Sequence, residues 1–480
     1  MTRYMSPKEI RAFQPDRPLP AGADPIRHAR MVMVETGQWT PRQMMGRRWA
    51  VGCVALEITQ RCNLDCTLCY LSEHSEAVRD MPLEEVWRRI DAIHAMYGPG
   101  TNVQVTGGDP TLRKRSELVA IVRRLRERGL LPALFTNGIK ATRDLLAELR
   151  DAGLVDVAFH VDTTQERKGY RTETDLHAVR RDYIARARGL GLSVFFNTTV
   201  HDGNLAEVPG LARFFVEEGE GVELASFQLQ ADTGRGTQRA RDEDLVSVDN
   251  VARRLHAGAG AEFRFDGNGI GHDQCNRYAM TLVANGRVHD LLADAAFPLE
   301  LLDRTARAEV WVDRTRWGPA ARRFAGFLAR NPGLAMRGVA WAGGTAWRMR
   351  HDLLAARSRA RKLSFFIHNF MDACHLDPER IKACSFKVAT ADGPVSMCLH
   401  NAKRDDFILR PIRVEGAGIG GAFWDPLTGE TRTAAEAPPI PAPERRPVYQ
   451  HPKLLKGRAR EAARQARAAA ADATVGGGQG

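Results

Sequence analysis

Three cysteines within eight residues constrain this chain more than any other feature. Cys62, Cys66 and Cys69 are separated by three and then two residues, so one short loop carries three thiols. Thiolate ligands select iron–sulfur clusters or zinc. Structural zinc sites are usually closed by four ligands, whereas three thiolates can hold three corners of a cubane cluster and leave its fourth iron open. The spacing therefore favours an open cluster, with zinc as the alternative.

Strand-like segments alternate with amphipathic helices on both sides of this loop. Residues 54–59 form a short apolar run with strand character, and the cysteine loop follows them directly. Strands alternating with helices predict βα units on a parallel sheet. We count about six such units up to residue 235, so we expect an α/β barrel, partial or complete, with its chemistry on the loops after the strands. The predicted strands are residues 54–59, 102–106, 132–135, 155–161, 193–200 and 226–230, and the predicted helices are residues 82–96, 118–127, 144–152, 176–190 and 209–217.

Two further motifs follow predicted strands. Residues 106–110 read TGGDP, and glycines there let the backbone approach a ligand closely. Taken alone, this segment could equally be a plain strand-to-helix turn. Residues 136–138 read TNG and follow the next predicted strand. Because the carboxyl ends of parallel strands share one edge of the sheet, both motifs are expected beside the cysteine loop.

Together these motifs resemble the radical S-adenosylmethionine (SAM) superfamily. Residues 56–70 carry its cysteine spacing, and residues 106–110 are similar to its Gly-Gly-Glu-Pro segment. Two positions depart from the family pattern, because Leu68 stands where an aromatic residue is frequent and Asp109 where Glu is more common. These departures weaken assignment to a subfamily more than assignment to the superfamily.

The resemblance spans residues 54–236 and implies a partial (β/α)6 barrel whose [4Fe–4S] cluster binds SAM. In that family the reduced cluster gives one electron to SAM, which yields methionine and a 5′-deoxyadenosyl radical that abstracts hydrogen from an unactivated C–H bond. An electron donor such as ferredoxin or flavodoxin is then required. The implied cluster ligands are Cys62, Cys66 and Cys69, and the implied SAM-binding residues are Tyr70, Gly107, Gly108, Asp109, Pro110, Asn137, Asp162, Asn197 and Thr199, with weaker expectations over residues 228–236.

A second set of cysteines lies downstream of this core. Four thiols after a radical SAM core favour an auxiliary [4Fe–4S] cluster with four protein ligands. His272 and His400 are alternative ligands, zinc is the alternative occupant, and inert buried thiols are the structural alternative. Cys53 lies beside a predicted strand and is expected to be a packed thiol. The expected auxiliary ligands are Cys275, Cys374, Cys384 and Cys398.

A narrower resemblance concerns the C-terminal region. Residues 370–384 and 392–401, together with residues 159–164, are similar to segments of the tetraether-synthase-like radical SAM proteins. That group acts on lipid chains or is described as C-methyltransferases. It often carries further N-terminal cysteines, and residues 1–50 here contain none. The resemblance therefore implies an apolar substrate without fixing the reaction.

Positive charge is concentrated in residues 304–362. The chain has a net charge of +11, and this segment holds 14 Lys and Arg against three acids, with four tryptophans among them. Arg and Trp on amphipathic helices suit a membrane interface with anionic headgroups. The alternatives are a core-packing helical subdomain and, least favoured, a nucleic-acid-binding face. We expect peripheral contact with an anionic membrane surface.

The sequence shows neither a secretory signal nor an apolar run long enough to cross a bilayer. We therefore expect a cytoplasmic protein, peripheral at the inner membrane face. The expected organisation is an irregular N-terminal extension (residues 1–50), a radical SAM core (51–260), a mixed α+β region with the basic helices and auxiliary cysteines (261–435), and a basic tail without fixed structure (436–480).

Three functions compete. The first is a radical enzyme that modifies an apolar, lipid-like chain by C–C coupling or C-methylation, and the second is a radical SAM enzyme that matures a peptide. The third, a non-enzymatic iron–sulfur or RNA-binding protein, is disfavoured because it needs no SAM pocket. No acid–base catalyst is assigned, since His160, Asp162 and His272 are each more often structural.

Overall fold

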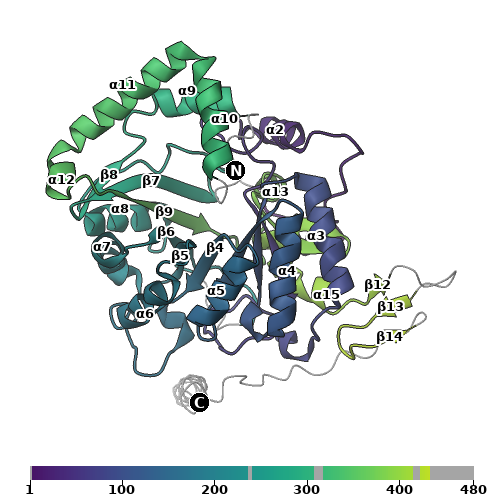
Figure 1. The fold of residues 1–480 in the computed structure, drawn as a ribbon. Helices are drawn as coiled ribbons and strands as arrows, with labels where there is room; N and C mark the ends of the chain where they lie inside the picture. Colours follow the sequence, from purple (N-terminus) through teal and green to yellow (C-terminus); the bar gives the residue numbers. More distant parts are fainter. Residues whose placement is uncertain (1–2, 236–240, 307–316, 415–421, 433–480) are drawn as a thin grey trace, which may run out of the picture.

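The computed structural model describes residues 3–235, 241–306, 317–414 and 422–432 (Figure 1). Within these ranges, one mixed sheet of eleven strands, ordered β11-β10-β1-β2-β3-β4-β5-β6-β9-β7-β8, organises the chain. The eight strands from β10 to β9 in this order run parallel to one another. Antiparallel strands extend the sheet at both ends, β11 beside β10 and then β7 and β8 beside β9. The strands are β1 (Cys53–Thr59), β2 (Asn102–Gly107), β3 (Leu131–Thr136), β4 (Asp156–His160), β5 (Ser193–Val200), β6 (Val222–Leu229), β7 (Asn276–Ala284), β8 (Arg287–Asp290), β9 (Arg361–Asn369), β10 (Phe386–Thr390) and β11 (Gly393–Ser396).

The predicted βα units are confirmed. Alternate residues of β1 divide between two environments, since Val54, Leu56 and Ile58 join the main apolar core, whereas Ala55 and Glu57 face the inside of the sheet. The apolar stripes of the helices cover the outer face. These helices are α3 (Leu83–Tyr97), α4 (Arg115–Glu127), α5 (Arg143–Asp151), α6 (His177–Ala187), α7 (Val208–Glu218) and α8 (Val248–Ala259).

Side-chain contacts bring together strands from near the two ends of the curled, partial-barrel sheet. Phe386 of β10 contacts two residues of β9, with ring-centroid distances of 6.2 Å to Phe366 and 4.7 Å to His368. Asn276, at the start of β7, donates to Ser385 Oγ at 3.2 Å across the same seam. Strands near opposite ends of the sheet order thus meet through their side chains, and the barrel encloses an interior space.

The N-terminal region is more regular than predicted. We expected residues 1–50 to be irregular because of their prolines, but helices α1 (Pro7–Ala12) and α2 (Pro25–Glu35) form there. Ser6 and Glu9 make a capping box around α1, and Asp24 caps α2. Both helices begin with proline at a first-turn position, where the missing N–H has no helical partner to lose.

The C-terminal region contributes to the same sheet, which the sequence did not predict. The basic segment of residues 304–362 was expected to be helical, yet β9 begins at Arg361 and pairs with β6 of the core. The hairpin of β7 and β8 was also missed. Its turn is Asn285-Gly286, with φ of 53° and 70°, a pair that is a strong local signal for a tight hairpin.

Four helices form a cap beyond β7 and β8 (Figure 1): α9 (Ala296–Thr305), α10 (Trp317–Ala329), α11 (Pro332–Arg348) and α12 (Arg350–Ala355). Phe297 of α9 packs against Trp341 of α11 at 5.6 Å between ring centroids, and the Trp341 indole donates to Asp294 O at 3.0 Å. The described helices include none that is long and apolar enough to traverse a bilayer. The predicted tail of residues 436–480 lies outside the described residues.

The remaining elements are short. They are the helices α13 (Pro378–Lys382), α14 (Met397–Ala402) and α15 (Arg404–Ile408), the strands β12 (Ile412–Val414), β13 (Ala422–Trp424) and β14 (Thr431–Arg432), and the 3₁₀ turns Ser75–Ala77, Pro110–Leu112, Thr163–Gln165 and Leu205–Glu207.

Replacement of Gly107 should destabilise the fold. Gly107 ends β2 with φ of 129°, and a Cβ there would lie 1.9 Å from Thr59 O. Gly107→Ala should therefore cost roughly 2 kcal/mol or more of unfolding free energy, measured by denaturant titration. Gly210→Ala on α7 is the matched control, because no neighbouring atom lies within 4 Å of its Cβ. Equal stabilities of the two variants would contradict this account of the β2 end.

Candidate active site

The three cysteines lie together in the loop that follows β1. They share a small buried cluster with Leu64 and Leu71 and line the barrel cavity. Burial and then neighbouring acid and thiol groups raise the pKa of Cys62, and burial and the other two thiols raise that of Cys66. The sulfurs are thus close enough to repel one another as thiolates. A metal cluster would deprotonate them and supply the missing positive charge, so this donor set fits an iron–sulfur cluster.

Arg235 lies behind this loop. Its side chain is buried and pairs with Glu76 at 2.9 Å and with Asp65 at 3.8 Å, and the nearby Cys69 contributes to the raised pKa of the guanidinium, against the effect of burial. The preceding Gly234 has φ of 73°, and a Cβ there would lie 2.2 Å from Cys69 O. The segment 228–236, predicted to reach SAM, therefore packs against the cysteine loop at residues 234–235, while Gly236 lies outside the described residues.

The TGGDP segment supports the loop from the end of β2. Gly107 and Gly108 line the cavity, and the Tyr70 hydroxyl donates to Gly107 O at 2.5 Å. A Cβ on Gly108 would lie 2.1 Å from Arg61 O, just as one on Gly107 would meet Thr59 O. We predicted that these glycines let the backbone approach a ligand. In the structure they let β2 approach the segment that leads into the cysteine loop.

Asp109 is fully buried behind the cavity wall. It accepts hydrogen bonds from Thr136 Oγ1 and from Asn137 N, each at 2.8 Å, and from Thr111 N at 3.0 Å. Burial raises its pKa, although these donors oppose the shift. Its side chain joins the TGGDP turn to the TNG turn, and the neighbouring Pro110 is buried without lining the cavity.

Asn137 is a predicted SAM-binding residue whose side chain lies beside a cluster ligand. It lines the cavity, and its side-chain nitrogen donates to Asn63 Oδ1 at 2.6 Å and lies 3.9 Å from Cys62 Sγ. A hydrogen bond to a coordinating sulfur is one of the ways in which a protein tunes an iron–sulfur cluster.

His160, Asn197 and Thr199 line the cavity at the ends of β4 and β5, whereas Asp162 lies behind them. The carboxylate of Asp162 contacts His160 Nε2 at 2.6 Å and accepts from Thr199 N at 2.8 Å. Burial alone would raise the pKa of Asp162, but His160 and these donors hold it well below its usual range. Asp162 raises the pKa of His160 in return, against the effect of burial. Asp162 therefore orients cavity-facing groups from outside the cavity.

A buried ion pair missed by the sequence analysis joins β1 to α15. Arg404 donates to both carboxylate oxygens of Glu57, at 2.7 and 2.8 Å, and its guanidinium lies 4.8 Å from the ring centroid of Tyr70. Burial would raise the pKa of Glu57, but Arg404 and then His400 lower it to about 2. An acid within the apolar run of residues 54–59 was the available signal, because a buried carboxylate requires a partner.

Three of the four predicted auxiliary cysteines, Cys275, Cys384 and Cys398, lie near enough to interact, since Cys384 adds to the effect of burial, which raises the pKa of the other two. Burial and the neighbouring Cys384 raise the pKa of Cys398 to about 12, and burial is the main cause of a pKa of about 11 for Cys275. Arg380 Nε donates to Cys275 Sγ at 3.2 Å. The fourth, Cys374, is exposed in the loop before α13. The auxiliary site remains a prediction.

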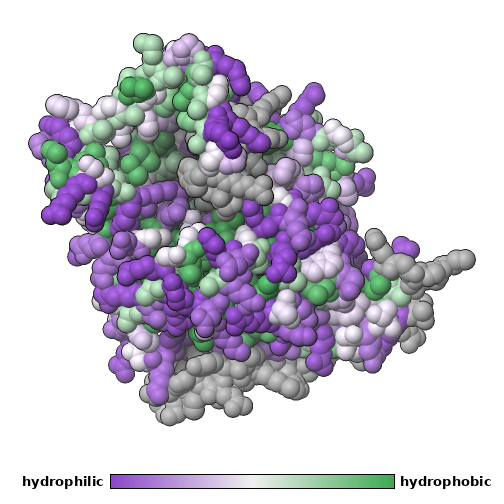
Figure 2. All heavy atoms as spheres, in the orientation of Figure 1, coloured by the Kyte–Doolittle hydropathy of each residue, from purple (hydrophilic) through white to green (hydrophobic). Residues whose placement is uncertain are grey.

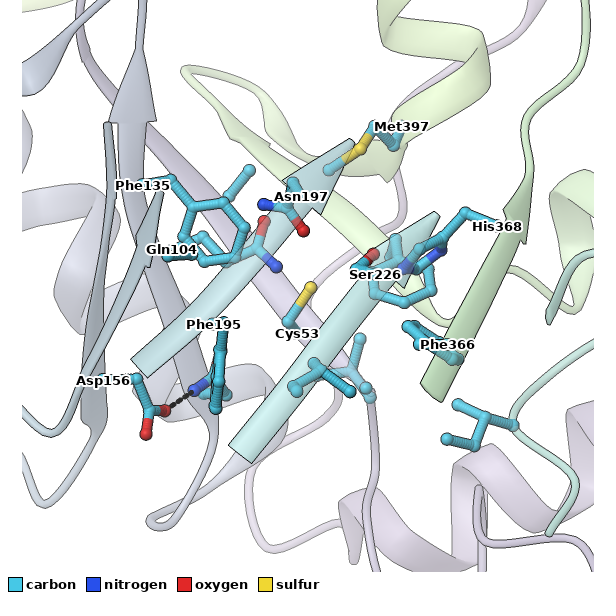
Figure 3. A pocket seen from close by; sticks show the side chains of 18 of the residues that line it. Cys53, Gln104, Phe135, Asp156, Phe195, Asn197, Ser226, Phe366, His368 and Met397 are labelled. Atoms are coloured by element: carbon cyan, nitrogen blue, oxygen red, sulfur yellow. Dashed lines mark hydrogen bonds between the residues drawn. The ribbon is translucent and has the colours of Figure 1, made fainter. Parts of the chain in front are cut away.

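A cavity of about 1260 Å³ adjoins the cysteine loop and the strand ends (Figure 3), whereas Cys275, Cys374, Cys384 and Cys398 do not line it. Residues at the ends of the strands, the cysteine loop, Phe370, Met371, Met397, Asn401 and Arg404 line one end of it. Within the described ranges, no three His, Cys, Asp or Glu side chains are arranged to hold a single metal ion. A cubane cluster places each thiolate on a different iron, so its ligands need not converge on one point.

Residues 56–215 match the model of the radical SAM superfamily, so this part of the chain is a radical SAM domain. The cofactors of such a domain are a [4Fe–4S] cluster and SAM. The superfamily assignment, the α/β partial-barrel fold and these two cofactors, all expected from the sequence, are confirmed.

Curated relatives resemble this domain. The chain is 28% identical over 200 residues to a 7,8-dihydro-6-hydroxymethylpterin dimethyltransferase of Methanocaldococcus jannaschii, covering 40% of this chain and 39% of that protein. It is 30% identical over 182 residues to a PqqA peptide cyclase of Bradyrhizobium diazoefficiens, covering 36% and 46%. The chain thus spans less than half the length of either relative. A crystal structure of Streptococcus suis SuiB bound to S-adenosylmethionine aligns with a TM-score of 0.34 and 14% identity over 43% of this chain and 47% of that one.

Removal of Arg404 should lower the unfolding free energy of the protein by an amount that depends on pH. Arg404→Met leaves a buried carboxylate without its cation, which costs about 3–5 kcal/mol at pH 7. The native pKa of Glu57, about 2, lies below its unfolded value, so the pair stabilises the wild type above about pH 4.3 and this contribution is lost as the pH falls towards 2. The deficit of the variant should therefore shrink in acid, measured by urea titration at pH 7 and at about pH 3.

The exposed pair of Arg410 and Asp392, at 2.7 Å, supplies the control. Arg410→Met should change the unfolding free energy by less than about 1 kcal/mol at either pH. A similar loss of unfolding free energy in both variants would show that the buried Glu57–Arg404 pair stabilises the fold no more than an exposed pair does.

Proposed function

We propose that this chain is a radical SAM enzyme that modifies an unactivated C–H bond of an apolar, lipid-like substrate, by C–C coupling or C-methylation. The observation that carries the proposal is the cavity, which reaches from the cysteine loop along an interior with many apolar side chains. Phe135, Phe195, Leu224, Met280 and Phe366 all line it. Apolar walls of this kind bind hydrocarbon and exclude water.

When bound, the [4Fe–4S] cluster and SAM supply a 5′-deoxyadenosyl radical. Cys62, Cys66 and Cys69 would hold the cluster, and the predicted SAM-binding residues that line the same end are Tyr70, Gly107, Gly108, Asn137, Asn197 and Thr199. Asp109 and Asp162 fix this wall from behind through hydrogen bonds to backbone N–H groups. The chain's contribution is to hold reacting groups together and to keep water and competing hydrogen donors away from them.

An auxiliary [4Fe–4S] cluster is part of the proposal. Cys275, Cys384 and Cys398 supply three thiols in one neighbourhood, and the exposed Cys374 is the predicted fourth ligand. Ferredoxin or flavodoxin is proposed as the electron donor, and the inner face of the cytoplasmic membrane as the place of action.

Peptide maturation is the second candidate function. It is favoured by the relative named PqqA peptide cyclase, whereas the relative named dimethyltransferase favours methyl transfer. A peptide needs polar partners for its backbone along the whole binding site. Gln104, Ser226 and His368 line the interior and can supply some of these, while the aromatic and aliphatic walls favour the hydrocarbon.

The Cys66→Ala variant tests the radical chemistry. Anaerobically reconstituted wild type should hold about eight irons per chain and release 5′-deoxyadenosine when reduced with dithionite. Cys66→Ala should lose that release and about four irons, because one corner of the cluster has no ligand. Cys384→Ala should lose about four irons but keep the release, and Cys53→Ala should keep both. No iron and no release in the wild type would overturn the proposed function.

Deuterium transfer tests the substrate class. If the radical attacks an acyl chain, 5′-deoxyadenosine formed with perdeuterated-chain phospholipid should gain deuterium, detected by mass spectrometry. Undeuterated lipid and a deuterated peptide library are the controls. Deuterium arriving from peptides and not from lipid would replace the lipid substrate with the second candidate function.

A further inference from the structure

The cavity extends well beyond the cysteine loop. Asn102, Leu131 and Asp156 are the first residues of β2, β3 and β4, and all three line it. In parallel strands these residues mark the edge opposite to the cysteine loop. The same cavity is lined by Leu299 of α9 and Trp341 of α11. It therefore runs the full height of the barrel and ends beneath the helical cap.

The C-terminal region covers the end that holds the cysteines. Met371, Met397 and Arg404 line the cavity there, and Figure 3 shows Met397 at that end above Asn197. Arg404 is fixed by its ion pair with Glu57. The described chain thus places a cover over the cysteine end and a helical cap at the other end.

One face of the cap is apolar and exposed. Met336, Val339 and Trp347 of α11 and Leu354 of α12 are 73, 74, 68 and 76% exposed, and apolar side chains gather over these helices in Figure 2. No other large apolar residue among those described exceeds 57% exposure. Contiguous exposed apolar surface of this kind marks an interaction site.

The charge of the cap identifies the partner. Residues 317–356, which span α10–α12, contain six arginines and one acid, Asp352, and one of these arginines, Arg337, pairs with Glu300 of α9. That aspartate is buried and lies 3.1 Å from His289 of β8, so it does not offset the arginines at the surface. The Arg350 guanidinium lies 4.5 Å from the Trp347 ring, which places cation and aromatic side by side. Exposed Trp, Val and Met beside arginines match an anionic bilayer surface.

We infer that α10–α12 dock on an anionic membrane and that a lipid chain passes from the bilayer beneath α9 and Trp341 into the amino-terminal end of the barrel. This inference rests on the proposed function, because it supplies the route by which a lipid would reach the cysteine end. The cap holds the protein at the bilayer, and Leu299 of α9 and Trp341 of α11, which packs against Phe297, form the roof of the passage. The lipid's acyl chain then lies along the apolar interior of the barrel.

Vesicle flotation tests the docking surface. Wild-type protein should float with phosphatidylglycerol vesicles and not with phosphatidylcholine vesicles. The Val339→Asp/Trp347→Asp double variant should bind at least about tenfold more weakly, because it places two anions in the interface. Leu245→Asp, at a leucine 41% exposed outside the cap, should bind like wild type. Iron content and melting temperature verify that each variant is folded.

Wild-type protein that stays in the soluble fraction, or a double variant that floats like wild type, would overturn the docking surface. If the wild-type protein is a dimer and the double variant is a monomer, the apolar face is the contact with a second copy of the chain. That outcome would also overturn the membrane-docking surface. Wild-type release of 5′-deoxyadenosine with no vesicle binding would remove this inference and leave the radical chemistry intact.

A blocked interior tests the passage. Leu224 lines the cavity on β6, two residues after the strand begins. Leu224→Trp should weaken binding of the fluorescent fatty acid cis-parinaric acid at least about tenfold, because the larger ring occupies the space of the chain. Leu245→Trp is the matched control and should bind like wild type. Unchanged affinity in a folded Leu224→Trp variant would place the chain elsewhere and overturn the route.

Discussion

The ion pair between Glu57 and Arg404 is the interaction on which the candidate site depends. It lies inside the barrel, where an isolated charge of either sign would be costly, so neither side chain can move without the other. Glu57 belongs to the first strand, and Arg404 comes from a short helix about 350 residues later. Because the guanidinium also covers the ring of Tyr70, the pair links the first strand, the cysteine loop and the C-terminal cover in one contact.

The alternation of side chains across the sheet explains how one barrel can hold both a polar reaction end and an apolar interior. Every second residue of a strand faces inward, so each strand presents a short column of side chains along the cavity. On β5 this column reads Phe195, Asn197 and Thr199 from the amino-terminal to the carboxyl end. On β6 the corresponding column begins with Leu224 and ends with Gln228. On these two strands polarity therefore rises towards the cysteine loop, where SAM is expected, whereas Asn102 of β2 and Asp156 of β4 keep part of the opposite edge polar.

Local sequence signals predicted the core because its elements are local. Each βα unit between residues 54 and 230 carries its own periodicity and turn residues, and the cysteine spacing is contained in one loop. The joining of β9 and β10 to the core sheet depends on contacts far apart in sequence, which periodicity does not report. Similarly, Asp109 and Asp162 were recognisable as members of motifs, but only the fold shows that they act from behind the cavity wall. The three neighbouring auxiliary thiols come from separate segments for the same reason.

Helix α11 shows why the basic segment supported two interpretations from sequence. Leu334, Trp341 and Thr345 recur at helical spacing and turn inward, which satisfies the prediction of a core-packing subdomain. Met336, Val339 and Trp347 recur at similar spacing on the exposed side, which satisfies the description of an interfacial helix. The two interpretations thus describe two faces of one helix. The inward face lines the cavity, and the outward face is apolar and accompanied by arginines, so the cavity lining and the proposed membrane contact belong to opposite faces of the same helix.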